Sequence, residues 1–225
     1  MGRECRSLFN SGSGWMVGAD ASGLELRMLA HYLYKYDGGA YAREILDGDI
    51  HTKNQQAAGL ETRDIAKTFI YMFIYGGGDQ AIGELVSSKK GEKAKEVGRE
   101  TRKKFLSEIK GLNELISDVK YKSLKNKGVI GLDKRFVPCD SEHKALNYLL
   151  QSAGAIVMKQ ATINFWKDNK FNCYQVLHIH DEFEVISLKE KDNELIGQHM
   201  VDSITQAGID FNLRIKLDGE YKIGK

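Results

Sequence analysis

The sequence has 225 residues, of which 42% are hydrophobic and 28% are charged, with a formal net charge of +2. These values are typical of a globular protein with one sizeable core or two modest subdomains, and they do not by themselves indicate a nucleic-acid partner. No run approaches the roughly 18 apolar residues of a membrane-spanning helix, and the first ten residues lack the apolar core of a signal peptide. We therefore expect a cytoplasmic protein with no membrane partner.

The few cysteines in the chain do not have the spacing of a zinc site. The three cysteines are Cys5, Cys139 and Cys173, an odd number at distant positions, and none belongs to a C-x-x-C pair. We expect them to be reduced and structural.

The first half of the chain predicts one strand followed by helices. Residues 15–20 read as a short strand that ends on Asp20, and residues 23–33 carry leucines at helical spacing. A turn-rich link follows at 47–52. The next helix begins at Thr62, a plausible N-cap, and three glycines at 76–78 end it.

The second half predicts longer helices and a hairpin. Residues 89–110 carry nine Lys or Arg against four Glu, which indicates an exposed basic helix. A long amphipathic helix is predicted at 141–165, a hairpin at 178–185, a helix at 192–208 and a strictly alternating strand at 209–217. Strands near both ends with helices between them suggest one mixed sheet interrupted by a helical insertion.

Two adjacent acids, Asp181 and Glu182, lie at the tip of the predicted hairpin. Acids at a hairpin tip are often only solvated turn residues. A second aspartate nearby would instead indicate a metal site, because paired carboxylates bind hard cations such as Mg²⁺ together with water or phosphate oxygens. Asp20, at the end of the first strand, can supply that partner if the two strands are neighbours.

The helix that begins at Thr62 carries a stripe of related side chains. Arg63, Lys67, Tyr71 and Tyr75 recur every four residues, so that two cations precede two aromatic rings on one face. A helix N-terminus with Arg and Lys can neutralise a triphosphate, and a ring one or two turns later can stack on a base. The alternative is a solvated cationic edge beside a tyrosine-lined core.

Four segments in this order resemble the motifs of family A DNA polymerases, most closely those of small tailed bacteriophages. The segment GADASGLELRMLAHYL resembles motif A, RDIAKTFIYMFIYGGG the fingers helix, LLQSAGAIVMK the palm helix and HIHDEFEV motif C. The similarity runs from about Arg6 to Lys222. It implies an α+β right-hand polymerase fold, with palm at residues 1–50 and 136–225 and fingers at 51–135.

The resemblance implies roles for the acids. Asp20 and Asp181 would bind two Mg²⁺ ions, or Mn²⁺, with the backbone carbonyl of Ala21 as a further ligand, for nucleotidyl transfer to a primer 3′-hydroxyl. Glu182 would lie beside the ions without being a constant ligand. His180 would approach the primer end.

The resemblance also implies a nucleotide site. Residues matching His51, Arg63 and Lys67 contact the incoming deoxynucleoside triphosphate, and Lys67 is a candidate proton donor to the pyrophosphate. Tyr71 would lie against the sugar and base. Glu25 would block the sugar's 2′ position and accept a hydrogen bond from Tyr71, unless it only pairs with a neighbouring arginine.

Primer-template DNA is the implied polymeric substrate. Asn147 and Gln151, four residues apart on one helix, would donate to the minor-groove acceptors that every base pair presents, or else cap backbone groups. Tyr75, at the end of the stripe, is a further candidate for DNA contact.

The sequence departs from the family pattern in two respects. Met72 occupies a position where the family has glycine, close to the nascent base pair. Only about nineteen residues precede motif A, where the family has its thumb and any exonuclease. We therefore expect these parts on a second polypeptide of a split enzyme, with a natural minimal form or an engineered fragment as alternatives. A noncatalytic DNA-binding or assembly subunit is the alternative function, and a metal-dependent nuclease would leave the cationic stripe unexplained.

Overall fold

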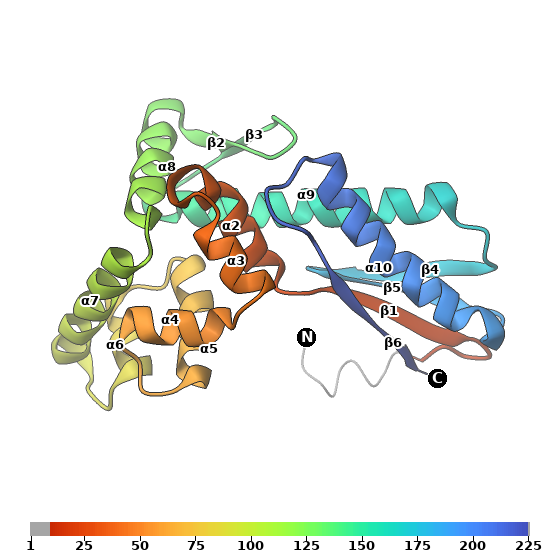
Figure 1. The fold of residues 1–225 in the computed structure, drawn as a ribbon, viewed down its shortest axis with the longest axis horizontal. Helices are drawn as coiled ribbons and strands as arrows, with labels where there is room; N and C mark the ends of the chain where they lie inside the picture. The colour runs from red at the N-terminus through yellow and green to blue at the C-terminus, as the bar shows by residue number, and fades with distance from the viewer. Residues whose placement is uncertain (1–9, 225) are drawn as a thin grey trace. The chain divides into compact units, whose positions relative to one another are not determined.

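The chain forms two compact units in the computed structural model, which describes residues 10–224 (Figure 1). The sheet unit comprises Met1–Leu24 and Gly154–Lys225, and the helical unit comprises Glu25–Ala153. Cys5 lies outside the described residues, whereas Cys139 and Cys173 are half-buried free thiols. Within residues 10–224, no helix is both long and apolar enough to cross a bilayer.

The sheet unit contains a four-stranded antiparallel sheet in the order β4–β5–β1–β6. Its elements are β1 (Trp15–Ala21), the C-terminal part of α9 (Ala145–Asp168), β4 (Cys173–Ile179), β5 (Glu182–Ser187), the 3₁₀ turn η2 (Glu190–Asp192), α10 (Asn193–Asp210) and β6 (Gly219–Gly224). The strands at the two ends of the chain thus meet in one sheet, as the sequence predicted.

Alternation along the central strands separates a buried face of the sheet from an accessible one. Val17 and Ala19 of β1 and Phe183 and Val185 of β5 are fully buried. Phe165 of α9 packs on this face, with its ring centroid 5.8 Å from that of Phe183. Because side chains alternate between faces, the acids next to these positions, which are Asp20, Glu182 and Glu184, lie on the other face.

The predicted strand at 209–217 is wrong. Helix α10 continues to Asp210, the backbone of Asn212 is left-handed with φ of 50°, and the amide of Leu213 donates to the carbonyl of Gly208. Ile215 and Leu217 are buried. The alternation of exposed and buried residues at 214–217 reflects the packing of an irregular segment. The last strand of the sheet, β6, begins only at Gly219.

The helical unit is built mainly from seven helices, a small hairpin and the start of α9. Its elements are α2 (Leu24–Asp37), α3 (Ala40–Leu46), α4 (Ile50–Ala58), α5 (Arg63–Ile74), α6 (Asp79–Val86), α7 (Gly91–Glu108), α8 (Leu112–Asn126), β2 (Gly128–Ile130), β3 (Phe136–Pro138) and η1 (Glu142–Lys144). Phe105 of α7 is fully buried and meets Phe69 of α5 edge to face, with ring centroids 5.1 Å apart. A Cβ at Gly83 would lie 1.7 Å from the carbonyl oxygen of Ala94, so only glycine permits this approach of α6 to α7.

Helix α5 has the boundaries that its predicted caps indicated, whereas the helix predicted at 141–165 is α9 and begins at Ala145 after a 3₁₀ turn. The Thr62 hydroxyl accepts from the amide of Ile65, and α5 ends before the glycines, as predicted. The basic helix is also confirmed, as α7. The link predicted at 47–52 is wrong in its second half, because Asp49 caps α4 and the helix begins at Ile50.

Candidate active site

The acids predicted to meet do so at one end of the sheet. Asp20 of β1 is directly opposite Glu182 of β5 in the antiparallel register. The amide of Ala21 donates to the carbonyl oxygen of Asp181, with the two atoms 2.9 Å apart. Asp20 thus lies on β1 and Asp181 in the turn that leads into the neighbouring strand β5, not on a strand itself.

The closeness of these acids changes the protonation of Asp20. Partial burial, followed by the negative charges of Asp181 and Glu182, raises the pKa of Asp20 to about 6, although Lys222 opposes the shift. A nearby divalent cation would relieve this repulsion between carboxylates.

The donor set suits a hard divalent ion. Among the described residues, no three His, Cys, Asp or Glu side chains form a ready-made metal cage. Mg²⁺ does not need one, since it is commonly held by one or two carboxylates and completes its shell with water and substrate phosphates. Asp20, Asp181 and the carbonyl of Ala21 therefore fit such an ion.

His180 occupies the turn between β4 and β5, next to Asp181. Its backbone is left-handed, with φ of 53°, and its side chain is exposed. A non-glycine residue in this region is uncommon, although histidine tolerates it better than most residues. The turn thus presents an imidazole beside the acids.

In the helical unit, the predicted stripe lies on α5. The side chains of Arg63 and Lys67 are exposed in the first two turns. One and two turns later, the rings of Tyr71 and Tyr75 are stacked at a centroid distance of 6.4 Å and an angle of 25°. The helix thus combines a cationic first half with an aromatic second half.

His51 belongs to the same cluster as the two cations. It lies in the first turn of α4, where burial, then Arg63 and Lys67, lower the pKa of its imidazole. The buried Nδ1 atom of His51 has no hydrogen-bond partner. A phosphate could supply that partner, so the structure brings together the three residues predicted to contact a triphosphate.

Asp49 also belongs to this cluster, although the sequence reading did not select it. Its carboxylate accepts two hydrogen bonds from Arg63, at 2.7 Å from Nε and 3.1 Å from Nη2. The sequence signal was available, because an aspartate at the start of a helix is a common N-cap.

The expected partner of Glu25 requires a correction. We expected a hydrogen bond from Tyr71, but the hydroxyl that donates to Glu25 Oε1, at 2.7 Å, belongs to Tyr75, one turn further along α5. Helix periodicity makes both tyrosines candidates, and only the packing of α2 distinguishes them.

Asn147 and Gln151 lie on the first part of α9. The side-chain oxygen of Asn147 is buried without a hydrogen-bond partner, and Gln151 is exposed and bonds Tyr75. Neither arrangement resembles the backbone cap that was the alternative for these amides.

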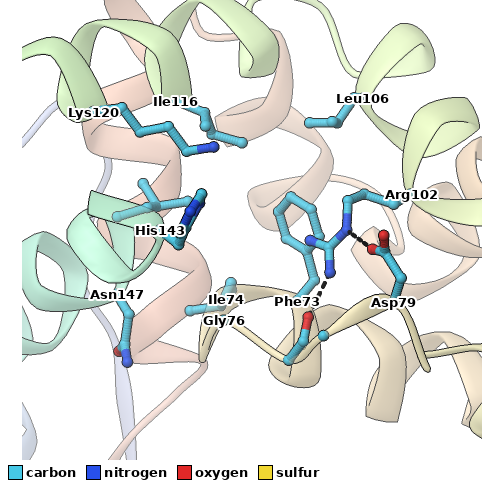
Figure 2. Close-up of a pocket in the computed structure, with 13 residues that line it drawn as sticks. Phe73, Ile74, Gly76, Asp79, Arg102, Leu106, Ile116, Lys120, His143 and Asn147 are labelled. Carbon is cyan, nitrogen blue, oxygen red and sulfur yellow. Dashed lines mark hydrogen bonds and ion pairs between the residues drawn. The ribbon is translucent and has the colours of Figure 1, made fainter. Parts of the chain in front are cut away.

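Asn147 also lines a cavity of about 370 Å³ in the helical unit (Figure 2). Figure 2 shows Lys120 and His143 on one side of this cavity and Arg102 with Phe73 on the other. Arg102 is fixed there, because it donates to Asp79 at 2.7 Å and to the carbonyl of Gly77. Arg102, Lys120 and His143 come from α7, α8 and η1, and no local pattern in the sequence joins them.

Met72 is half-buried and packs beside the glycines that end α5. A Cβ on Gly77 would lie 2.4 Å from Cγ of Met72, and the amide of Gly77 donates to the carbonyl of Met72. The methionine therefore covers the last turn of α5.

Comparisons with known proteins identify relatives along the whole chain. The family model described as DNA polymerase family A matches residues 1–225. The chain is 39% identical over 257 aligned residues to the DNA-directed DNA polymerases of Enterobacteria phage T3 and Escherichia phage T7, covering 99% of this chain and 36% of each relative. It thus spans little more than a third of the length of these relatives.

A solved structure shares the fold. The polymerase domain of Pol1 from M. smegmatis, solved in complex with a DNA primer-template and a deoxynucleoside triphosphate, matches with a TM-score of 0.77 at 20% identity. The match covers 96% of this chain and 40% of that one.

Proposed function

Because the chain belongs to DNA polymerase family A, we propose that it performs the nucleotidyl transfer of a DNA-templated DNA polymerase. The observation that carries this proposal is the register of β1 against β5, which places Asp20 beside Glu182 and Asp181. The reaction joins the primer 3′-oxygen to the α-phosphorus of a deoxynucleoside triphosphate and releases pyrophosphate. For phage-type relatives, the place of action would be the cytoplasm of the bacterial host.

Asp20 and Asp181 are the proposed metal ligands, with the carbonyl of Ala21. Mg²⁺ ions held there, or Mn²⁺, would lower the pKa of the primer hydroxyl and neutralise charge on the leaving pyrophosphate. Glu182, which is paired with Asp20 across the strands, raises the local negative charge and orients ligands. His180 projects from the adjacent turn toward the primer end.

The helical unit supplies the proposed nucleotide contacts. Arg63 and Lys67 neutralise the triphosphate, and the unpartnered Nδ1 of His51 adds a third contact. Lys67 also donates a proton to the departing pyrophosphate. These roles use the two cations in the first turns of α5, where the positive helix end adds to their charge.

Sugar selection follows from the second half of α5. Tyr71 lies against the sugar and base of the nucleotide. Glu25, held by the hydroxyl of Tyr75, closes the space beside the 2′ position and disfavours ribonucleotides.

Primer-template DNA would be held by neutral and cationic groups. Asn147 and Gln151 donate to minor-groove acceptors, which tests the shape of a base pair and not its sequence. Tyr75 and the basic helix α7 extend this surface, and the cations around the cavity of Figure 2 suit a nucleic-acid phosphate.

Primer extension with Asp20→Ala and Asp181→Ala tests the proposal. Each variant should lose extension while keeping its circular dichroism spectrum and thermal midpoint near those of the wild type. Asp202→Ala, on the exposed face of α10, is the matched control and should extend primers normally. Ordinary extension by either active-site variant would exclude the metal assignment.

The same assay separates the remaining possibilities. A fragment carrying a thumb and exonuclease, expected from the resemblance, is added in a parallel reaction to test whether a second polypeptide is needed. DNA binding without extension under Mg²⁺ or Mn²⁺, with and without that fragment, would instead support a noncatalytic DNA-binding subunit.

A further inference from the structure

Asp49 ties together the starts of two helices. Its carboxylate accepts from the amides of His51 and Thr52 at 3.0 and 3.3 Å and from the Thr52 hydroxyl at 2.9 Å, which caps α4. The same carboxylate accepts from Nε and Nη2 of Arg63, the first residue of α5. One acid therefore fixes both the helix that carries His51 and the guanidinium of Arg63.

Ordinary stability does not account for an acid at this place. Asp49 and Arg63 are exposed, and an exposed ion pair usually contributes little to the free energy of unfolding. A negative charge beside a proposed triphosphate site would also repel the ligand. Capping alone could be done by serine, threonine or asparagine without that repulsion.

The geometry of the pair leaves the arginine able to bind phosphate. A guanidinium has five N–H donors in a rigid plane. Asp49 engages the edge formed by Nε and one hydrogen of Nη2, and both hydrogens of Nη1 and the second hydrogen of Nη2 lie outside this pair. The carboxylate therefore fixes the plane of Arg63 from one edge and leaves the other edge to a ligand.

We propose that Asp49 is a positioning residue for the triphosphate: it fixes Arg63 and the first turn of α4 before the nucleotide arrives. This inference rests on the proposed function, because it requires Arg63 to contact the triphosphate. Holding a long side chain in place in advance removes part of the entropy cost that binding would otherwise carry. The hydrogen bond from Arg63 keeps the pKa of the Asp49 carboxyl well below its usual range, so the carboxylate remains charged at neutral pH.

Asp49→Asn is the informative variant. Asparagine caps a helix about as well as aspartate, so α4 should persist. It lacks the charge and the second carboxylate oxygen that fix Arg63. Asp47→Asn is the matched control, since it removes an acid from the same link two residues earlier.

Isothermal titration of the 225-residue chain with dATP in the presence of Mg²⁺, and separately with inorganic tripolyphosphate, measures the effect. Asp49→Asn should raise both dissociation constants by about fivefold to tenfold, as the cost of ordering one long side chain implies. Its thermal midpoint should stay near that of the wild type. Asp47→Asn should bind as tightly as the wild type or more tightly.

Arg63→Ala, alone and combined with Asp49→Asn, shows whether the effect passes through the arginine. In the Arg63→Ala background the second substitution should leave the dissociation constants unchanged or lower them, because the group that Asp49 positions is gone and only a repelling charge is removed. Equal losses from Asp49→Asn in both backgrounds would overturn the positioning role.

The outcomes separate this inference from the proposed function. If Arg63→Ala weakens binding and Asp49→Asn leaves it unchanged or tightens it, Asp49 does not position Arg63, and the proposed function stands. If Arg63→Ala leaves binding unchanged, or the wild type binds neither probe, the triphosphate site on α5 is wrong and the inference falls with it.

Discussion

The hydroxyl of Tyr75 donates a 2.7 Å hydrogen bond to Glu25, which joins the end of α5 to the first turn of α2. Burial, and then this carboxylate, raise the pKa of Tyr75 to about 12, so the phenol remains a donor at neutral pH. The two residues are fifty positions apart in the sequence. In the proposed function, this bond holds Glu25 beside the 2′ position of the nucleotide sugar.

Tyr75→Phe should weaken discrimination against ribonucleotides. The substitution removes the donor to Glu25 and releases the carboxylate, at a cost of about 1 kcal/mol for one hydrogen bond. We expect the ratio of kcat/KM for deoxynucleotides over ribonucleotides to fall several-fold in single-nucleotide primer extension. Tyr71→Phe makes the same chemical change one turn earlier and should leave this ratio near the wild-type value. An unchanged ratio in Tyr75→Phe would show that the bond does not position Glu25.

Tyr71→Phe should instead restore discrimination against dideoxynucleotides. The resemblance implies that a phenol at Tyr71 substitutes for the missing 3′-hydroxyl of a dideoxynucleotide, and phenylalanine has no hydroxyl to offer. The measurement is chain termination at a fixed ratio of dideoxy- to deoxynucleotide, with Tyr75→Phe as the control. Equal termination by wild type and Tyr71→Phe would place Tyr71 away from the sugar.

Asp20→Asn should stabilise the metal-free protein at neutral pH. The pKa of Asp20 is raised from 3.8 to about 6, so the folded protein binds more protons than the unfolded chain between these values. Stability from this group is therefore full below about pH 4 and is lost as the pH rises through 6. Asparagine cannot ionise, so Asp20→Asn does not lose this stability as the pH rises. Because solvent screens the site, we expect the free energy of unfolding to increase by only about 1 kcal/mol at pH 7.

Urea denaturation in EDTA at pH 4 and pH 7 measures the difference. The gain for Asp20→Asn over wild type should be near zero at the lower pH and appear at the higher one. Asp202→Asn, on the outer face of α10, should show the same difference from wild type at both values. A gain that is independent of pH would contradict the assigned cause.

Arg102→Lys should loosen the wall of the cavity shown in Figure 2. Arg102 joins Asp79 to the carbonyl of Gly77 and lies over the ring of Phe73 at 5.4 Å, a combination that the lysine ammonium cannot reproduce. We expect a loss of about 1–2 kcal/mol in the free energy of unfolding, measured by urea denaturation. Arg99→Lys, whose side chain is exposed and 3.9 Å from Asp79, should change stability little. If both substitutions lowered the free energy of unfolding equally, Arg102 would not stabilise the cavity wall through these contacts.

Local features of the site could be predicted from the sequence because they depend on neighbouring residues. Thr62 can cap only the helix that follows it, and Arg63, Lys67, Tyr71 and Tyr75 share a face in any α-helix, because residues four apart are adjacent. The hairpin with its acidic tip follows from alternation and turn composition in the same way.

The tertiary structure decided which distant groups meet. The alternating residues at 209–217 predicted a strand, but alternation does not specify hydrogen-bond partners. In the structure, the turn after α10 directs this segment away from the sheet, and it pairs with no strand. The pairs Asp20 with Glu182, Glu25 with Tyr75 and Asp49 with Arg63 join separate elements. Periodicity shows which face of an element is buried, whereas the partner of each side chain depends on how the elements pack, which no local pattern encodes.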